Sequence, residues 1–263
     1  MIPHFDLSPE ERASAAWDAY LCQNVMSHMT IAWETGMTDA DFDALWSERQ
    51  DLSWGENDGF YIGRDSVRSY LLEDREACAA ASQKLICTAD PTVPFGPEGL
   101  RAGSMDRVNL MSPLIEVARD GKTAKGMWYC PGVSTAVEAD AKMHLQWHYS
   151  RFAADFVLEG DCWKLWHVFM GSEFRFEMGH AYIPATGMKP LPDATVYAQN
   201  PATVGMPCAE DYRRPYDLKK KLYSIDYGWS PYPVTPIPYE SFETTFSYGP
   251  EPFMSLMGKE CAE

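Results

Sequence analysis

The alternation of apolar and polar residues predicts helices in the first third of the chain and antiparallel strands in the middle third. Ser8, Pro9 and Glu11 form a helix start, because Ser caps the helix, Pro occupies its first position and Glu its third. This first helix is predicted to run to about Thr35, where Gly36 ends it.

Two further helices and a short hairpin are predicted before residue 90. A short helix covers 38–46, and a longer one runs from 65 to about 86. Between them, the stretches 51–54 and 60–62 flank an Asn-Asp-Gly turn signal, which predicts a pair of antiparallel strands. The following residues, 89–106, are rich in Pro and Gly and are predicted to form a loop.

A long hairpin is predicted around Asp120-Gly121, which is a turn signal. Counting outward from this turn pairs Glu116 with Lys125, an opposite-charge pair on one face. The other face then carries apolar residues, including Trp128. Charge pairing and hydrophobic alternation therefore agree on the register.

A second long hairpin is predicted in 144–170. Placing its turn at 159–160 pairs Asp155 with Lys164 and Phe156 with Trp163. The charged pair again lies on one face and the apolar pair on the other, so this register is predicted on the same grounds.

Beyond residue 182 the composition changes. Twelve of the 19 prolines and nine of the 14 tyrosines lie between Tyr182 and the end of the chain. We predict a domain of residues 1–182 and a C-terminal extension, 183–263, that packs over this domain or over a neighbouring subunit.

Several stretches resemble the SnoaL-like branch of the NTF2-like superfamily. The matching sequence motifs are DFDALW at 41–46, GRDSVR at 63–68, and Asp155-Phe156-Val157 followed by GDCWKL at 160–165. The resemblance covers about residues 12–175. It implies an α+β fold, an NTF2-like cone in which three helices pack on a curved mixed or antiparallel sheet.

A sub-branch of long SnoaL-like proteins is more similar. It shares sequence motifs such as Trp54-Gly55, SPLIEVA at 112–118, DGKTAKG at 120–126 and PYESF at 238–242. This sub-branch contains the cofactor-independent γ-formaldehyde lyases of lignin-derived diarylpropanes. The resemblance implies a lyase without fixing its substrate.

Charge and composition exclude several classes of partner. The formal net charge of −16 argues against nucleic acid and against anionic membrane surfaces, which both need concentrated Lys and Arg. The N-terminal residues lack the pattern of a signal peptide. The seven cysteines are scattered without a Cys-x-x-Cys pair, which fits reduced thiols in a cytoplasm.

The alternation in the second hairpin selects candidate pocket residues. If Phe156 faces the helices, then His148, Ser150, His167 and Phe169 face them too. Any single buried histidine is explained as well by a satisfied core hydrogen bond. Two histidines beside a serine on one concave face favour a site, with His148 and His167 as catalytic candidates.

The first helix is expected to supply the opposite wall. Tyr20, Asn24 and His28 are spaced four residues apart and form a stripe, which would bring a phenol, an amide and an imidazole toward the sheet. His28 is therefore a second candidate base. The alternative is that Asn24 and His28 lie on an exposed edge of the helix.

Aromatic side chains and one turn residue complete the predicted substrate contacts. Trp54 and Trp128, with Phe169, are expected to hold rings, and Asp58 lies in the Asn-Asp-Gly turn. We predict no metal, because His144 and His148 on a strand are roughly 13 Å apart. Phosphate-loop and dinucleotide signatures are also absent from the sequence, so no cofactor is predicted.

These observations together predict a cofactor-independent lyase acting on a small aromatic or polycyclic alcohol by general acid/base catalysis. The alternatives are a non-catalytic NTF2-like binding protein and a SnoaL-type cyclase or isomerase. A homo-oligomer, dimer or trimer, is expected because Trp147, Tyr149 and Trp166 would otherwise be exposed on the outer sheet face.

Overall fold

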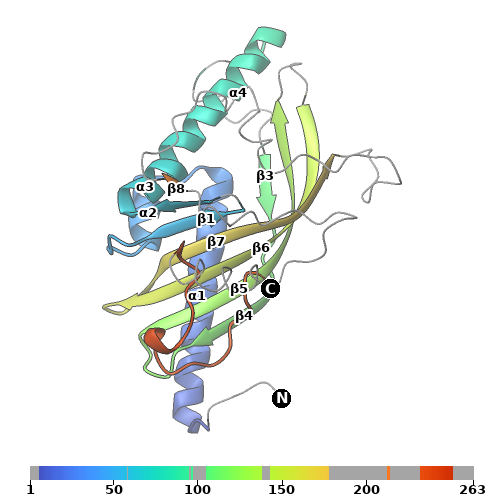
Figure 1. Ribbon diagram of the computed structural model, residues 1–263. Helices are drawn as coiled ribbons and strands as arrows, with labels where there is room; N and C mark the ends of the chain where they lie inside the picture. Colours follow the sequence, from blue (N-terminus) through green and yellow to red (C-terminus); the bar gives the residue numbers. More distant parts are fainter. Residues whose placement is uncertain are drawn as a thin grey trace.

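The computed structural model describes residues 6–57, 59–94, 96, 105–137, 143–177, 212–213 and 232–250 (Figure 1). In chain order the elements are α1 (Pro9–Thr35), α2 (Asp39–Leu45), β1 (Ser53–Glu56), β2 (Gly59–Ile62), α3 (Arg64–Ser69), the π-helical turn η1 (Tyr70–Asp74), α4 (Arg75–Ala89), β3 (Met105–Val108), β4 (Met111–Val117), β5 (Thr123–Val137), β6 (Met143–Glu159), β7 (Cys162–Glu177), β8 (Tyr212–Arg213) and the 3-10 turn η2 (Phe242–Thr244).

The first two helices begin and end where the sequence predicts. At the start of α1, the Ser8 hydroxyl accepts a hydrogen bond from the Glu11 amide at 3.2 Å, and the Glu11 carboxylate accepts one from the Ser8 amide at 2.7 Å. Thr38 and Asp41 form the same reciprocal cap on α2. Each cap stabilises its helix by about 1 kcal/mol.

The third predicted helix is continuous through α3, η1 and α4, and it ends three residues later than expected, at Ala89. Its π-helical turn covers Tyr70–Asp74. Because a π-helix bonds residues five apart, this turn brings Tyr70 and Arg75 to the same side of the helix.

The strands form one eight-stranded mixed sheet. Its order is β3-β5-β6-β7-β1-β2-β8, and β4 pairs with the same edge of β5 as β3 does. β1 runs parallel to β7, and the other pairs are antiparallel. The sheet is curved and does not close, and the predicted arrangement of three helices on a curved mixed sheet is confirmed (Figure 1).

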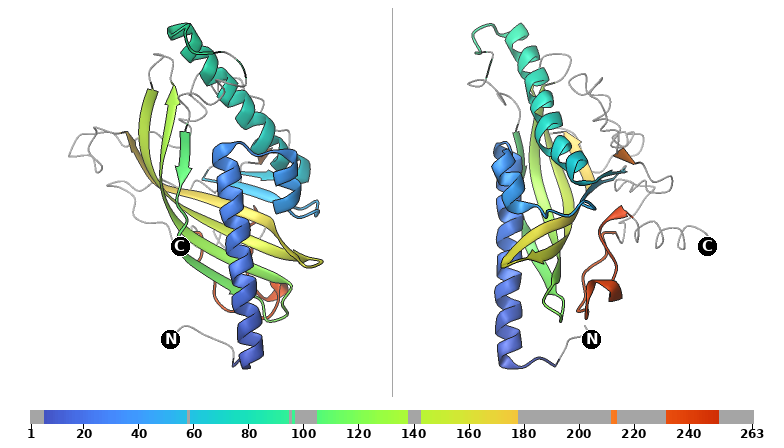
Figure 2. Two further views of the ribbon diagram at one scale, coloured as in Figure 1. Left: turned by 180° about the vertical axis from the view of Figure 1, so that it is seen from behind. Right: turned by 90° about the vertical axis from the view of Figure 1, so that its left-hand side faces the viewer.

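The two faces of the sheet are covered by different parts of the chain. α1 lies across one face, here called the inner face, and residues 232–250, here called the C-terminal arm, lie against the opposite, outer face (Figure 2). Most of the main hydrophobic core lies between α1, α2 and the inner face. The prediction of a boundary at 182/183 falls outside the described residues.

The helical stripe predicted to face the sheet is on the wrong side of α1. Tyr20 is 53% exposed, and its neighbours Trp17 and Ile31 are 60% and 58% exposed. The buried stripe is instead formed by Cys22, Met26, Met29, Ala32 and Trp33. This stripe follows the 3- and 4-residue spacing of an apolar helix face, and the larger apolar area that it buries decides the helix rotation.

The first hairpin has the predicted register, with Glu116 opposite Lys125. The second hairpin differs by two positions. Glu159 pairs with Cys162, which leaves a two-residue loop at 160–161 in which Gly160 has a φ of 61°. Lys164 is therefore opposite Val157, and the predicted Asp155–Lys164 pair is wrong.

A β-bulge in β7 changes which face the later residues occupy. Phe156 is opposite Leu165, on the face that strict alternation predicts. Its neighbour Asp155 is opposite His167 and not Trp166, so Trp166 is an extra residue in β7. From His167 to Ser172 the alternation is reversed. His167 and Phe169 therefore lie on the outer face, where the sequence predicted the inner one.

The C-terminal arm is tied to the first hairpin through its backbone. The amides of Arg119 and Asp120 donate to the carbonyls of Tyr239 and Glu240 at 3.0 and 3.1 Å. Within the arm, the Tyr248 hydroxyl donates to the Val234 carbonyl at 2.6 Å. These bonds hold the arm across the ends of β4 and β5.

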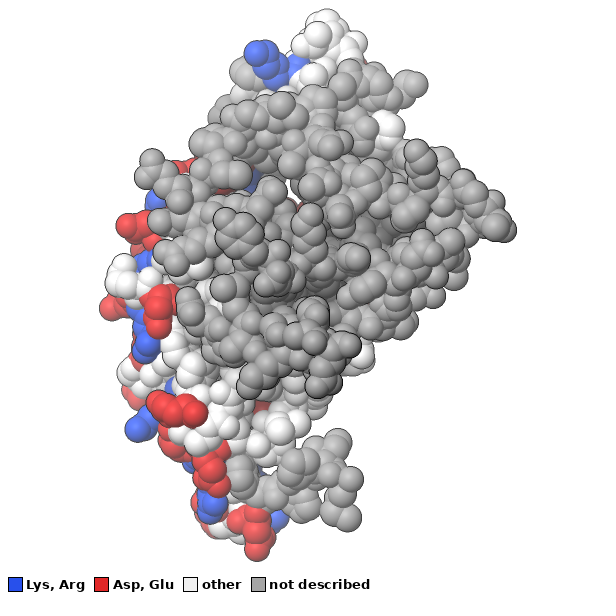
Figure 3. Space-filling view, viewed as in Figure 1, with Lys and Arg blue, Asp and Glu red and all other residues white. Residues whose placement is uncertain are grey.

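Charged side chains of both signs occupy the surface. In Figure 3, acidic and basic groups lie among one another along the left-hand edge. Among the described residues, helices that combine the length and hydrophobicity of a membrane span were not found.

Candidate active site

The inner face of the sheet is lined by aromatic rings where it meets the C-terminal half of α1. Trp33 stacks on Trp54 with 4.7 Å between ring centroids, and Trp54 meets the edge of Phe152 at 6.1 Å. Trp128 is fully buried, and its indole donates to Gln23 at 2.7 Å. Trp54 and Trp128 thus lie on the face where the sequence places them.

His148 projects from β6 into this face. It sits opposite Gly132 of β5, and its side chain is 9% exposed. Its Nε2 makes no hydrogen bond within the described part of the chain. The carboxylate of Asp106 lies beside it, with Oδ1 3.7 Å from Nε2. The imidazole is therefore buried with one nitrogen available beside a carboxylate.

Gly132 gives the imidazole its space. A Cβ at this position would stand 2.4 Å from His148 Cε1 and 2.2 Å from the carbonyl oxygen of Arg107 on β3. Any side chain here must push the imidazole or β3, and β3 carries Asp106.

We expect Gly132→Ala to separate His148 from Asp106. Misplacement by about 1 Å lowers turnover roughly 100-fold, and the overpacking costs about 1–3 kcal/mol of unfolding free energy. Steady-state kinetics and urea unfolding measure the two effects. Ser134→Ala, on the same strand and opposite Asp106, is the control. Unchanged turnover in Gly132→Ala would show that the imidazole position does not matter.

Asp106 is held in place from two sides. Its Oδ2 accepts a hydrogen bond from the Trp33 indole at 2.9 Å and lies 3.6 Å from the Arg75 guanidinium. Burial alone would raise the pKa of Asp106. The facing His148, the charge of Arg75 and the Trp33 N–H outweigh burial, so the pKa lies well below its ordinary value. Asp106 is therefore an anion beside the His148 imidazole.

A second acidic group lies at the other end of the aromatic stack. The Trp54 indole donates to Glu56 Oε1 at 3.0 Å, and the Tyr70 hydroxyl donates to the same oxygen. Tyr70 also stacks on Tyr61 at 4.1 Å. Burial, followed by the charge of Glu56, raises the pKa of Tyr70 well above its ordinary value, so Tyr70 remains a neutral hydrogen-bond donor.

Ser150 also lies on the inner face, as predicted, and it is 2% exposed. Its hydroxyl is 3.4 Å from that of Ser172 on β7. The Ser172 backbone is in turn bonded to the Asn57 side chain by two hydrogen bonds of 2.8 Å. This contact connects β6 and β7 to the β1–β2 turn.

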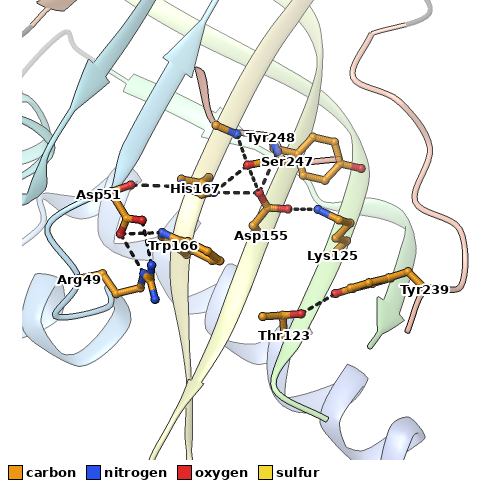
Figure 4. Close-up of polar contacts among 11 residues, drawn as sticks. Arg49, Asp51, Thr123, Lys125, Asp155, Trp166, His167, Tyr239, Ser247 and Tyr248 are labelled. Atoms are coloured by element: carbon orange, nitrogen blue, oxygen red, sulfur yellow. Dashed lines mark hydrogen bonds and ion pairs between the residues drawn. The ribbon is translucent and has the colours of Figure 1, made fainter. Parts of the chain in front are cut away.

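The catalytic role predicted for His167 does not fit its position. On the outer face, its Nδ1 lies 2.9 Å from Asp155 Oδ2 and 3.0 Å from the Ser247 hydroxyl, while Nε2 lies 3.2 Å from the Asp51 carbonyl (Figure 4). Both ring nitrogens thus have protein partners. Phe169 packs beside Phe60 and Tyr232 on the same face, away from the inner aromatic rings.

Asp155 is the centre of this outer-face network. It accepts hydrogen bonds from the Ser247 hydroxyl and the Tyr248 amide, both at 2.8 Å, and its Oδ1 accepts one from Lys125 at 2.6 Å (Figure 4). Lys125 and Asp155 are both fully buried. The network joins β5, β6 and β7 to the C-terminal arm.

Four rings of the C-terminal arm surround the Lys125 ammonium. The distances from Nζ to the ring centroids lie between 4.6 and 5.7 Å, for Phe246, Phe242, Tyr248 and Tyr239. Ring faces attract a desolvated cation. Burial lowers the pKa of Lys125, and the charge of Asp155 partly offsets this effect by raising it. We interpret the network as a structural clasp, since its polar groups bind one another.

The clasp predicts a defined loss of stability in acid. Burial would raise the pKa of Asp155, but Lys125 and His167 outweigh it and lower the pKa to about 2. Because this folded-state pKa lies below the ordinary value of about 4, the stability that Asp155 contributes is present above pH 4. It is lost as the pH falls toward 2 and amounts to about 2 kcal/mol.

Urea unfolding between pH 5 and pH 2 measures this loss. Asp155→Asn should be less stable at pH 5 and should show a smaller decrease on acidification. The same decrease in the wild type and in Asp155→Asn would contradict this assignment.

The three predicted residues of α1 are distant from the aromatic stack. Tyr20 stacks on Trp17 at the surface, Asn24 is half-buried, and His28 is exposed. His28 instead borders an open groove of about 360 Å³ between α1 and α2, together with Ile31, Ala32, Thr35, Asp41, Ala44 and Leu45. Asp58 lies outside the described residues. The prediction that this stripe faces the sheet is wrong.

Among the comparisons with known proteins, matches are found to solved structures alone. No protein-family model matches the chain, and no curated protein matches it. Similar solved structures include LinA type 2, a hexachlorocyclohexane dehydrochlorinase, with a TM-score of 0.45, 10% identity, and coverage of 69% of this chain and 100% of that one.

Two further solved structures are similar to a comparable extent. LinA type 3 from Novosphingobium barchaimii has a TM-score of 0.42, 12% identity, and coverage of 68% of this chain and 100% of that one. An NTF2-like superfamily protein from Salmonella enterica has a TM-score of 0.39, 14% identity, and coverage of 62% and 96%. Identities this low say nothing about this chain's substrate.

The described side chains do not include a group of three or more His, Cys, Asp or Glu that could hold a metal ion. His144 and His148 lie on the strand β6, as the sequence predicts.

Sequence reasoning missed the residues that surround His148. The sequence predicts a loop at Asp106, and it offers no turn signal that would fix the register of this four-residue strand. Trp33 could have been found, because it continues the 3- and 4-residue spacing of Cys22, Met26 and Met29. Arg75 follows a π-helical turn, which has no sequence signature of its own, and it stacks on Trp33.

Proposed function

We propose that the chain is a cofactor-independent lyase that acts on a small aromatic or polycyclic alcohol by general acid/base catalysis. The single observation that supports this most is the buried His148 Nε2, which has no hydrogen-bond partner among the described residues and lies 3.7 Å from the Asp106 carboxylate. A buried polar atom without a partner favours a ligand-binding role.

The pair is suited to moving a proton. His148 takes the proton, and the resulting imidazolium is stabilised by the anionic Asp106, which Trp33 and Arg75 hold in place. The surrounding rings exclude water, which strengthens the attraction between imidazolium and carboxylate. The same rings offer stacking surfaces for an aromatic substrate.

Two reactions fit one base and its conjugate acid. In dehydration, His148 takes a proton from the carbon next to the alcohol carbon, a C=C bond forms, and the imidazolium protonates the leaving hydroxyl to release water. In deformylation, His148 takes the proton of a primary hydroxyl and the adjacent C–C bond breaks, releasing formaldehyde. The imidazolium then protonates the carbon that keeps the electron pair.

The resemblance to γ-formaldehyde lyases of diarylpropanes favours deformylation. The test is to incubate the purified chain with diarylpropane diols and steroid-like alcohols while measuring formaldehyde and loss of water. We expect turnover of at least one alcohol without added cofactor, at a rate that a metal chelator leaves unchanged. Binding without turnover across the panel would contradict a lyase and favour a binding protein.

A further inference from the structure

Arg75 differs from other partly buried arginines of this chain. Arg151 contacts Glu173 through two nitrogens at 2.6 and 2.5 Å, and Arg49 contacts Asp51 through two nitrogens at 2.9 Å. The guanidinium of Arg75, whose side chain is 21% exposed, makes no hydrogen bond to a described residue, and its ion pair with Asp106 is long, at 3.6 Å.

The position of Arg75 is nevertheless fixed. Its guanidinium carbon lies 3.6 Å from the centroid of the Trp33 ring, which is a close stacking distance. Trp33 is itself held by its hydrogen bond to Asp106 and by its stacking on Trp54. Arg75 directly follows the π-helical turn Tyr70–Asp74. The Arg75 guanidinium therefore holds its planar set of N–H donors in a fixed position, without a hydrogen bond to a described residue.

The charges around Asp106 favour the binding of a second anion beside Arg75. The Arg75 guanidinium lies 3.6 Å from one oxygen of the Asp106 carboxylate, and His148 Nε2 lies 3.7 Å from the other. Once His148 has taken the proton from the substrate, two cations face one carboxylate. A ligand carboxylate beside Arg75 balances them, and the paired oxygens of a carboxylate match the guanidinium fork.

We propose that the substrate carries a carboxylate, which Arg75 binds while His148 acts on the alcohol. This inference rests on the proposed function for the identity of the site. Because His148 and Arg75 both lie within 4 Å of the Asp106 carboxylate, the acidic group and the reacting alcohol must be close together on one small aromatic molecule.

The test compares two probes of equal size, 4-(hydroxymethyl)benzoate and 4-(hydroxymethyl)benzamide, by NMR titration of the full chain. We expect the wild type to bind the benzoate roughly 10- to 100-fold more tightly, because a charge-assisted bidentate contact is lost in the amide. Arg75→Gln should bind both probes equally, and Arg75→Lys should retain a smaller preference.

Arg107→Gln is the matched control, because Arg107 lies on β3 next to Asp106. Its side chain is about half exposed and pairs with Glu34. Its preference for the benzoate should equal that of the wild type. Similar affinity for the two probes in the wild type, including no binding of either, would overturn the proposal. So would a preference that survives in folded Arg75→Gln, or one lost equally in Arg107→Gln.

Binding separates this proposal from the proposed function. If no alcohol is turned over but the benzoate preference depends on Arg75, the lyase is wrong and the carboxylate site stands. If alcohols without a carboxylate are turned over and the benzoate preference is absent, the lyase stands and the carboxylate site is wrong.

Discussion

Replacing Lys125 with Met should lower the free energy of unfolding by about 3–5 kcal/mol. Lys125 and Asp155 are both fully buried, with 2.6 Å between Nζ and Oδ1. Removing the cation leaves Asp155 as a buried anion with only the weaker donors Ser247, His167 and the Tyr248 amide. The four arm rings around the ammonium lose their cation as well.

Urea unfolding measures the loss, with Lys122→Met as the control. Lys122 lies three residues earlier on the same hairpin and is exposed, so its replacement should change stability by less than about 0.5 kcal/mol. The double variant Lys125→Met/Asp155→Leu should recover much of the loss, because no charge then remains buried.

Hydrogen exchange at the Tyr248 amide, which donates to Asp155, reports on the C-terminal arm directly. It should be faster in Lys125→Met than in Lys122→Met. If the two single variants are equally stable and equally protected, the clasp does not hold the arm.

Replacing His148 with Gln should lower turnover of the alcohol found in the panel by a factor of about 10² to 10⁴, which is the usual contribution of a general base. Glutamine keeps a similar volume and a polar end but cannot take a proton. Asp106→Asn, which keeps the shape of the carboxylate, should lower turnover by a smaller factor because it removes only the charge that stabilises the imidazolium.

His28→Gln is the matched control for His148→Gln, since His28 is exposed on α1. Its turnover should equal that of the wild type. Circular dichroism and thermal unfolding establish that each variant is folded. Turnover that falls in His28→Gln and persists in His148→Gln would place the chemistry in the groove between α1 and α2.

The sequence predicts those parts of the fold that depend on local signals. The caps at Ser8 and Thr38 and the turn at Asp120-Gly121 involve residues within a few positions of one another, and the predicted elements around them are confirmed. The inner-face position of His148 also follows from the alternation in β6, because the register between β5 and β6 is continuous.

One error arises where a single extra residue reverses the alternation of a strand. Trp166 is a bulge, and this one extra residue moves His167 and Phe169 to the outer face. The rotation of α1 was misjudged because Trp17, Tyr20 and Ile31 form an apolar stripe of their own, which in the structure is exposed. Tertiary packing on the sheet decides between two stripes on one helix.

The residues around His148 come from three separate segments. Asp106 is on an edge strand, Trp33 near the end of α1, and Arg75 after a π-helical turn. Each joins the site only through tertiary contacts, so spacing along the chain does not connect them. Structure was needed to recognise that the carboxylate near His148 is Asp106.

The position of a bound ligand tests the central claim most directly, namely that reaction takes place on the inner face at His148. A crystal of His148→Gln soaked with the alcohol that the wild type turns over should show density against the rings of Trp33 and Trp54, with a hydroxyl within hydrogen-bond distance of residue 148. Density in the groove beside His28, with the inner face empty, would contradict the account.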